Sequence, residues 1–163
     1  MPQRVLITAG AAGIGREFAR AFATNGAKVF VCDIDDEALS AIGKEIPGLT
    51  AQRCDMASRA EIARMVPAAV EALGRLDVLI NNAGIAGLTL PVEQYPPDDW
   101  DKVVAVNLTA MFDTTRLAIP HLKKSKAGVI VNMSSIAGRF GFANRSPYAA
   151  TKWAVIGDRK SVV

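Results

Sequence analysis

Five short apolar runs alternate with segments of helical pattern, and this alternation constrains the fold more than any other feature of the chain. The runs are rich in Val, Ile and Leu and lie at residues 5–8, 29–32, 49–54, 78–81 and 129–133. Such runs are typical of strands buried on both faces of a parallel sheet. Apolar residues recur at spacings of three and four in the segments 13–25, 35–45, 58–73 and 98–123, which predicts helices. We therefore expect an α/β fold with a doubly wound parallel sheet of about five strands.

The chain shows no internal repeat, low-complexity segment or linker, so we expect residues 1–163 to form one domain. The helix predicted at 58–73 begins with a capping box made by Ser58 and Glu61. Pro120 falls inside or at the end of the helix predicted at 98–123.

Charge and cysteine content narrow the function classes. The 19 basic and 16 acidic residues are scattered along the chain, without the basic stripe that nucleic acid or a membrane surface would need. Residues 1–4 lead directly into an apolar run, with no signal-peptide core or transmembrane run. Cys32 and Cys54 have no second histidine to complete a zinc set, so we expect buried, reduced thiols, no metal and a cytoplasmic location.

Polar or glycine-rich groups follow the ends of the predicted strands. They are the turn at residues 8–15, Asp33, Asp55, Asn81, and the pair Ser134 and Ser135. Because the carboxyl ends of parallel strands meet at one edge of a sheet, these groups are expected to face the same edge. Open parallel sheets bind ligands there.

The turn at residues 8–15 joins a predicted strand to a predicted helix. Such a turn presents backbone N–H groups and the positive end of a helix dipole to a pyrophosphate, and Gly13 and Gly15 permit close approach. A turn that only packs the helix on the strand is the alternative.

Asp33 can accept hydrogen bonds from ribose hydroxyls and repel a 2′-phosphate, which favours NAD. The alternative is a strand-terminal aspartate that only caps the next turn. Arg16 leaves NADP open.

Tyr148 and Lys152 stand four residues apart, thirteen residues after Ser135. Positions i and i+4 share one face of a helix, so the two side chains are expected to project together. A phenol must be acidified to act as a base near neutral pH, and an ammonium about 4 Å away can supply roughly 4 kcal/mol. Taken singly, a surface Tyr and Lys and a turn-capping serine are the alternatives.

With Asn81-Asn82-Ala83-Gly84 and Asn107 added, the motifs resemble, in order and spacing, those of the short-chain dehydrogenase/reductase family from residue 4 to about residue 157. The first glycine of the family turn usually stands at the position of Ala9. Members run to about 250 residues. They continue after the Tyr-x-x-x-Lys helix into a strand, a substrate lid and a further strand. Here residues 158–160 are instead charged, where the family commonly has leucine. We interpret the chain as C-terminally incomplete relative to the family.

The resemblance implies a Rossmann-type fold and interconversion of a secondary alcohol and a ketone by hydride transfer. Tyr148 would be the acid or base, Lys152 would also bind the nicotinamide ribose, and Ser135 would hydrogen-bond the carbonyl oxygen. Asn107 would kink its helix and hold a water that links Lys152 to solvent. The implied dinucleotide-binding residues are Gly10, Gly13, Ile14, Gly15, Asp33, Asp55, Met56, Asn81, Ala83, Gly84, Tyr148 and Lys152.

We expect NAD rather than NADP as the cofactor, a small alcohol or ketone as the substrate, and a homo-oligomer, either a dimer or a tetramer. Two alternatives to the dehydrogenase stay open. One is a non-catalytic nucleotide-binding or oligomerising fragment of such an enzyme. The other is an epimerase or dehydratase built on the same fold, which would bind a nucleotide sugar without net redox change.

Overall fold

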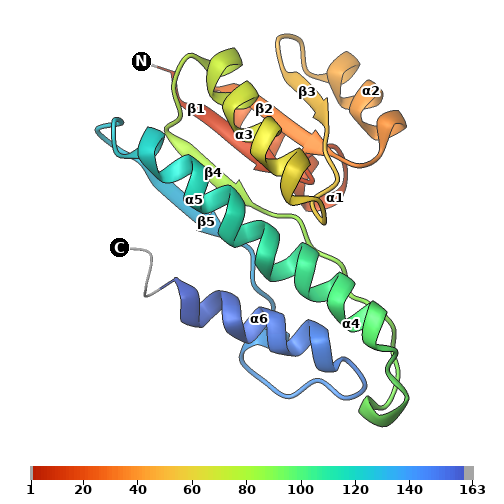
Figure 1. Cartoon of the computed structure of the whole chain (residues 1–163). Coiled ribbons are helices and arrows are strands. Elements are labelled where there is room, and N and C mark those ends of the chain that lie inside the picture. The colour runs from red at the N-terminus through yellow and green to blue at the C-terminus, as the bar shows by residue number, and fades with distance from the viewer. Residues whose placement is uncertain (1, 160–163) are drawn as a thin grey trace.

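In the computed structural model, which describes residues 2–159, five parallel strands form one sheet in the order β3-β2-β1-β4-β5 (Figure 1). Along the chain the strands are β1 (Arg4–Thr8), β2 (Lys28–Asp33), β3 (Thr50–Arg53), β4 (Val78–Asn81) and β5 (Val129–Asn132). The strand order reverses at β1 and β4, where a doubly wound sheet has its ligand-binding crevice. The predicted fold class is confirmed.

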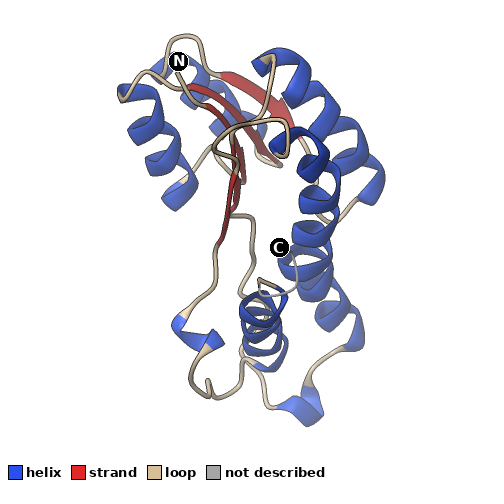
Figure 2. Cartoon of the chain, turned by 90° about the vertical axis from the view of Figure 1, so that its left-hand side faces the viewer, coloured by secondary structure: helices blue, strands red, loops and turns tan. Residues whose placement is uncertain are grey.

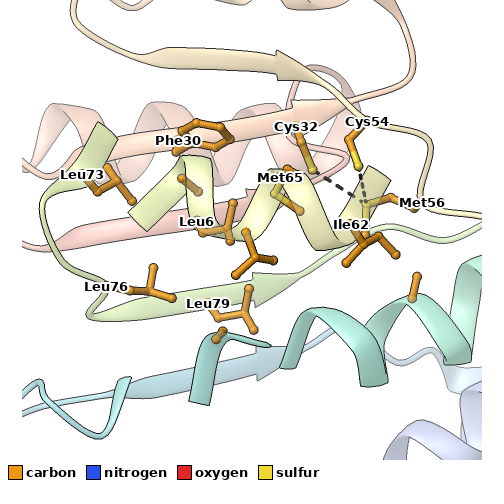
Figure 3. Close-up of a cluster of buried hydrophobic side chains, with 14 of the residues drawn as sticks. Leu6, Phe30, Cys32, Cys54, Met56, Ile62, Met65, Leu73, Leu76 and Leu79 are labelled. Carbon is orange, nitrogen blue, oxygen red and sulfur yellow. Dashed lines mark hydrogen bonds between the residues drawn. The ribbon is translucent and has the colours of Figure 1, made fainter. Parts of the chain in front are cut away.

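Helices cover both faces of this sheet (Figure 2). They are α1 (Gly13–Thr24), α2 (Asp36–Glu45), α3 (Arg59–Leu73), α4 (Pro97–Val104), α5 (Ala110–Leu122) and α6 (Ser146–Asp158). Apolar residues of α1 and α2 pack on one face, whereas α3 and α5 pack on the other. Figure 3 shows the core beneath α3, where Phe30 of β2 and Leu6 of β1 meet Ile62 and Met65. Helix α6 lies beyond β5, against α4 and the turn that precedes it.

The helix predicted at 98–123 is interrupted. A π-helical segment, η2 (Ala105–Thr109), separates α4 from α5, and Asn107 lies at its centre. The carboxamide of Asn107 bonds the backbone of Ile85, outside the helix. π-bulges are frequent at functional sites. Pro120 lies inside α5, within the range expected for it.

Two further details differ from the sequence interpretation. The edge strands β3 and β5 are not buried on both faces: Val129 and Val131, which lie on the same face of β5, are 47% and 37% exposed. No strand pairs with the outer edge of β3 or β5 in the described part of the chain. The capping box is only half formed: Ser58 accepts from the backbone N–H of Glu61, but the Glu61 carboxylate accepts from the N–H of Asp55.

Asp77 joins three segments at the amino edge of the sheet. Its carboxylate accepts hydrogen bonds from the backbone N–H of Arg4 (2.9 Å), Nε of Arg75 (3.0 Å) and Oγ of Ser125 (2.7 Å). Burial raises the pKa of Asp77, but the hydrogen bonds from Arg75, Ser125 and Arg4 together lower it by a larger amount. The pKa of Asp77 therefore lies below its usual value.

We expect this carboxylate to make the free energy of unfolding pH-dependent. A carboxyl whose pKa is lower in the folded state contributes stability above its unfolded pKa of about 3.9, and that contribution is lost as pH falls through the folded pKa. Asp77→Asn should therefore lower the free energy of unfolding at pH 7 by about 1.5–3 kcal/mol. It should also flatten the decline below about pH 4. Urea titrations over a pH series measure both, with the exposed Asp101→Asn as control. Parallel curves for the variant and the parent would show that Asp77 does not cause the decline.

Candidate functional site

One cleft at the carboxyl edge of the sheet joins segments from both ends of the chain. Its volume is about 530 Å³. Its lining includes several of the predicted residues: Gly13, Ile14, Asp33, Gly84, Tyr148 and Lys152. Ala9, Ala12 and Ser134 also line it and belong to groups that were expected at this edge, although no binding role was predicted for them. The remaining lining residues were not predicted: Asn82, Ile85, Ala86 and Met133. A hollow of about 610 Å³ beside β5 contains none of the predicted residues, so the candidate site is the former cleft.

The turn between β1 and α1 has no space for a side chain at Gly10 or Gly15. A Cβ added at Gly10 would lie 2.7 Å from Cγ1 of Val31, and one added at Gly15 would lie 2.7 Å from Nδ2 of Asn82. Gly13 has φ of +51°, which glycine adopts without strain. Both Gly10 and Gly15 are therefore packing positions behind the cleft, and Gly13 lies on its surface.

The amino end of α1 is open toward an anion. Its N-cap residue, Ala12, provides no side-chain hydrogen bond, and the first turn holds no acidic residue. The backbone N–H groups of this turn are therefore not capped by a side chain from within the helix. Together with the helix dipole, they form the kind of site that binds a phosphate group.

Thr8 and Asn82 hold the glycine turn against the end of β4. The Asn82 carboxamide donates to the carbonyl oxygens of Thr8 (3.1 Å) and Ala9 (2.9 Å), and the Thr8 hydroxyl accepts from the backbone N–H groups of Asn82 and Ala83 (both 3.0 Å). Ala9 has φ of 48°. This left-handed conformation costs an L-residue roughly 1–2 kcal/mol, and the two hydrogen-bonded carbonyls hold it in place.

Asp33 lines the cleft beside the glycine turn. Its carboxylate accepts hydrogen bonds from the backbone N–H groups of Ala11 (3.1 Å) and Ile34 (2.8 Å), so it connects the end of β2 to the glycine turn. Arg16, the cation nearest the turn in sequence, points elsewhere, because its Nε donates to Glu45 at 2.8 Å. Among residues 2–159, Asp33 and Lys152 are the only Asp, Glu, Lys or Arg residues in the cleft lining.

Tyr148 and Lys152 lie on α6 and line the cleft from its other end. Nζ of Lys152 is 5.8 Å from the centroid of the Tyr148 ring and donates to the carbonyl oxygen of Met133 at 2.8 Å. Lys152 is buried, and burial lowers its pKa. A Cβ added at Gly84 would lie 3.3 Å from Nζ, so Gly84 leaves the approach to the ammonium clear.

The two serines after β5 have different environments. Ser134 lines the cleft, and its hydroxyl donates to the carbonyl oxygen of Lys152 at 2.8 Å. Ser135 caps the short helix η3 (Ile136–Gly138), where its hydroxyl accepts from the backbone N–H of Ala137 at 3.2 Å. Ser135 is not among the cleft-lining residues, so its predicted contact with a substrate carbonyl stays a prediction.

Asn107 connects the wall of the cleft to α6. Its Oδ1 accepts from the N–H of Ile85 (2.7 Å), and its Nδ2 donates to the carbonyl of Ile85 (2.9 Å) and to Oγ1 of Thr151 (3.1 Å). Thr151 in turn donates to the carbonyl of Tyr148. Both amide protons of Asn107 are therefore donated to groups of this chain, and its side chain fixes the cleft-lining segment at Ile85 to α6. A water held at Asn107 stays a prediction.

Besides Gly10 and Gly15, four of the predicted dinucleotide-binding residues lie outside the cleft lining: Asp55, Met56, Asn81 and Ala83. Met56 is buried in the core beneath α3. Asn81 is buried and donates to Oγ1 of Thr115 (2.9 Å) and Oδ1 of Asn132 (2.8 Å), which ties β4 to α5 and β5. Its neighbour Asn82 reaches the cleft instead. The motif Asn-Asn-Ala-Gly already contains Asn82, so the sequence identified the right segment but not which of its two asparagines reaches the cleft.

Comparison with known proteins agrees with this geometry. The profile of the short chain dehydrogenase family matches residues 3–162. The chain is 36% identical over 157 residues to 2-dehydro-3-deoxy-L-rhamnonate dehydrogenase (NAD(+)) of Sphingomonas sp., covering 96% of this chain and 63% of the relative. It is 39% identical over 160 residues to a 3-oxoacyl-(acyl-carrier-protein) reductase of Thermotoga maritima, covering 96% and 65%. The chain thus spans less than two thirds of the length of these relatives.

Solved structures give the same fold. A metagenomic short-chain oxidoreductase in complex with NADP superposes with a TM-score of 0.91 at 35% identity, over 98% of this chain and 74% of that one. A variant of actinorhodin polyketide ketoreductase with NADPH gives 0.94 at 34% identity, over 99% and 64%. Within residues 2–159, no helix is both long and apolar enough to cross a bilayer.

Proposed function

Because this chain belongs to the short-chain dehydrogenase/reductase family, we propose that it transfers hydride between a nicotinamide dinucleotide and a secondary alcohol or ketone. The observation that supports this most is the shared cleft. It places the glycine turn after β1 opposite Tyr148 and Lys152, which are more than 130 residues away in sequence. In a nicotinamide dinucleotide the pyrophosphate links the adenosine to the nicotinamide ribose, so its cleft needs a phosphate site between an adenosine side and a reactive centre. The glycine turn supports the first assignment and the α6 residues support the second.

In this proposal the residues of α6 act on the reacting oxygen. The Tyr148 hydroxyl donates a proton to a ketone or accepts one from an alcohol. Lys152, held by the Met133 carbonyl beside the Tyr148 ring, stabilises the phenolate electrostatically and contacts the ribose. Ser135 donates to the substrate oxygen after its hydroxyl turns from the η3 cap. Bound nicotinamide would supply the hydride chemistry.

Two measurements on this chain test the proposal together. The first is NADH binding by fluorescence, and the second is NAD-linked turnover of a panel of secondary alcohols, sugars and hydroxy acids. Binding with turnover supports the proposal. Binding without turnover would favour a nucleotide-binding fragment of such an enzyme. Conversion of a nucleotide sugar without net redox change would favour an epimerase or dehydratase.

The cofactor proposal is NAD in preference to NADP. Asp33 supports it, because a carboxylate in the cleft repels a 2′-phosphate and can accept hydrogen bonds from ribose hydroxyls. Arg16 supports it as well, since its guanidinium is held by Glu45. The named relatives include an NAD(+) dehydrogenase, whereas the solved neighbours contain NADP or NADPH.

Asp33→Asn should change the cofactor preference of this chain. The variant removes the negative charge but keeps an oxygen acceptor, so we expect the ratio of NADPH to NADH affinity to rise about tenfold, or 1.4 kcal/mol. Fluorescence titration with both cofactors measures the ratio. The exposed Asp101→Asn serves as a charge-matched control and should leave the ratio unchanged. An equal rise in both variants would assign the effect to net charge rather than to Asp33.

The proposal also includes a homo-oligomer and a cytoplasmic location. Phe112 on α5 and Trp153 on α6 support the former, because both large apolar side chains are about half exposed (50% and 52%). Light scattering of the purified chain and fractionation of its host cell are the corresponding measurements.

A further inference from the structure

A positively charged side chain stands one helical turn before Tyr148. Arg145 is the N-cap residue of α6, and its carbonyl oxygen accepts a hydrogen bond from the backbone N–H of Ala149 at 2.9 Å. Tyr148 is the third residue of the same helix. Residues three apart along a helix are neighbours, with Cβ atoms about 5–6 Å apart. Arg145 therefore lies close to the residue proposed to act on the reacting oxygen.

The guanidinium of Arg145 reaches the segment that forms one wall of the cleft. Its Nη1 donates to the carbonyl oxygens of Ala86 and Gly87, both at 3.4 Å, and Ala86 lines the cleft. The backbone N–H of Leu90 donates to the carbonyl oxygen of Asn144 at 3.1 Å, so the two segments lie side by side. Contacts of 3.4 Å exceed the ordinary range of about 2.7–3.2 Å, and they hold the guanidinium only weakly.

The edge of this guanidinium that suits a carboxylate is free of protein partners. Within residues 2–159, Nε and Nη2 of Arg145 form no hydrogen bond or ion pair. These two nitrogens make up the fork that matches the two oxygens of a carboxylate. Arg20 uses the same fork within this chain, since its Nε and Nη2 donate to Oε1 of Glu45 at 2.9 and 2.6 Å. Arg145 is thus held through Nη1 and keeps its fork available for a ligand.

We propose that Arg145 binds a carboxylate of the substrate, so that the alcohol or ketone is a short hydroxy acid or oxo acid. This inference rests on the proposed function, because it concerns the substrate of the same site. The closeness of Arg145 to Tyr148 places the carboxylate within a few carbon atoms of the reacting oxygen. In the oxidation the carboxylate is unchanged: the carbinol carbon loses hydride to the dinucleotide, and the hydroxyl loses its proton to Tyr148.

The other charges of the cleft agree with an anion at this end. Asp33, the acidic residue of the lining, lies beside the glycine turn and bonds the N–H of Ala11. Lys152 is already held by the carbonyl oxygen of Met133 and is proposed to contact the ribose. Arg145 is therefore the cation with a free fork on the substrate side of Tyr148.

Two small acids and their methyl esters test this assignment. Lactate carries its carboxylate on the carbon that bears the hydroxyl, and 3-hydroxybutyrate carries it one carbon further away. Calorimetric titration of the chain in the presence of NADH measures the affinity for each acid and each ester, and it does not depend on turnover because NADH does not reduce these alcohols. We expect at least one acid to bind about 10–100 times more tightly than its ester. Equal affinity of acid and ester in both pairs overturns the proposal.

Arg145→Met removes the charge, keeps the aliphatic stem, and should bring the ratio of acid to ester affinity close to one. A purely structural role of Arg145 would weaken acid and ester alike and leave the ratio as in the parent chain, which overturns the proposal. Arg139→Met is the matched control, since Arg139 is an exposed arginine of the same loop and lies outside the cleft lining. It should keep the parental ratio, and an equal fall in both variants overturns the assignment to Arg145.

Turnover judges the proposed function separately. NAD-linked turnover without a preference for either acid contradicts only the role of Arg145. Acid binding that depends on Arg145, in a chain that turns over no substrate, contradicts only the proposed function. Circular dichroism verifies that each variant is folded.

Discussion

Replacing Tyr148 with phenylalanine is expected to lower NAD-linked turnover by at least about 100-fold while NADH still binds, because a general acid–base group contributes about 10²- to 10⁴-fold. Phenylalanine keeps the aromatic ring beside Lys152 and removes only the hydroxyl. Steady-state turnover of the best substrate from the panel measures the first effect. NADH fluorescence measures the second.

The chain provides a matched control for this substitution. Tyr95 is the only other tyrosine, and its hydroxyl accepts a hydrogen bond from the backbone N–H of Leu88 at 2.9 Å, outside the cleft lining. Tyr95→Phe removes the same atom and should leave turnover nearly unchanged. If Tyr148→Phe keeps the turnover of the parent chain, Tyr148 is not the acid or base. If both variants lose it equally, the loss reflects a general effect on the fold.

The sheet and its functional edge could be predicted because both follow from local patterns. Buried parallel strands need continuous apolar runs, and the run at 78–81 coincides with β4. Once the strands are parallel, residues at their carboxyl ends must share an edge, and this places Asp33 and the glycine turn in one cleft. Tyr148 and Lys152 join them because α6 forms over Ser146–Asp158 and packs against α4, η2 and η3.

Contacts with distant partners were not predicted. The family resemblance implied a kink at Asn107, but neither the π-helical form of Ala105–Thr109 nor the bonds of Asn107 to Ile85, which lies 22 residues earlier, was expected. Which of Asn81 and Asn82 reaches the cleft depends on which of them faces Thr115 of α5. Asn81 faces Thr115, so Asn82 lines the cleft. No local pattern in the sequence carries either contact.

The contacts of Cys32 and Cys54 with Met56 were not predicted for a related reason. The two cysteines are 22 residues apart in the sequence. Pairing of β2 with β3 brings them to the same end of the sheet, because Asp33 is in register with Arg53, and the turn after β3 adds Met56.

Gly15→Ala is expected to have the largest effect on cofactor binding of any change behind the cleft. The added Cβ would lie 2.7 Å from Nδ2 of Asn82 and 2.9 Å from Cα of Gly10, and it would also meet the carbonyl oxygen of Ala9. Two of these three atoms belong to the backbone, so the turn cannot yield without moving the segment that would hold the pyrophosphate. Overpacking of this kind costs about 1–3 kcal/mol of unfolding free energy.

Affinity for NADH should fall about tenfold or more in Gly15→Ala, equivalent to 1.4 kcal/mol, because the new methyl group also displaces the Asn82 carboxamide from the carbonyls that it fixes. Gly43→Ala is the control, since Gly43 is exposed in α2 and a Cβ there meets nothing within 4 Å. Alanine in a helix interior should raise stability by roughly 0.5–1 kcal/mol and leave NADH affinity unchanged. Urea unfolding and fluorescence titration give both quantities. Parental NADH affinity in a folded Gly15→Ala chain would mean that the dinucleotide does not bind along this turn.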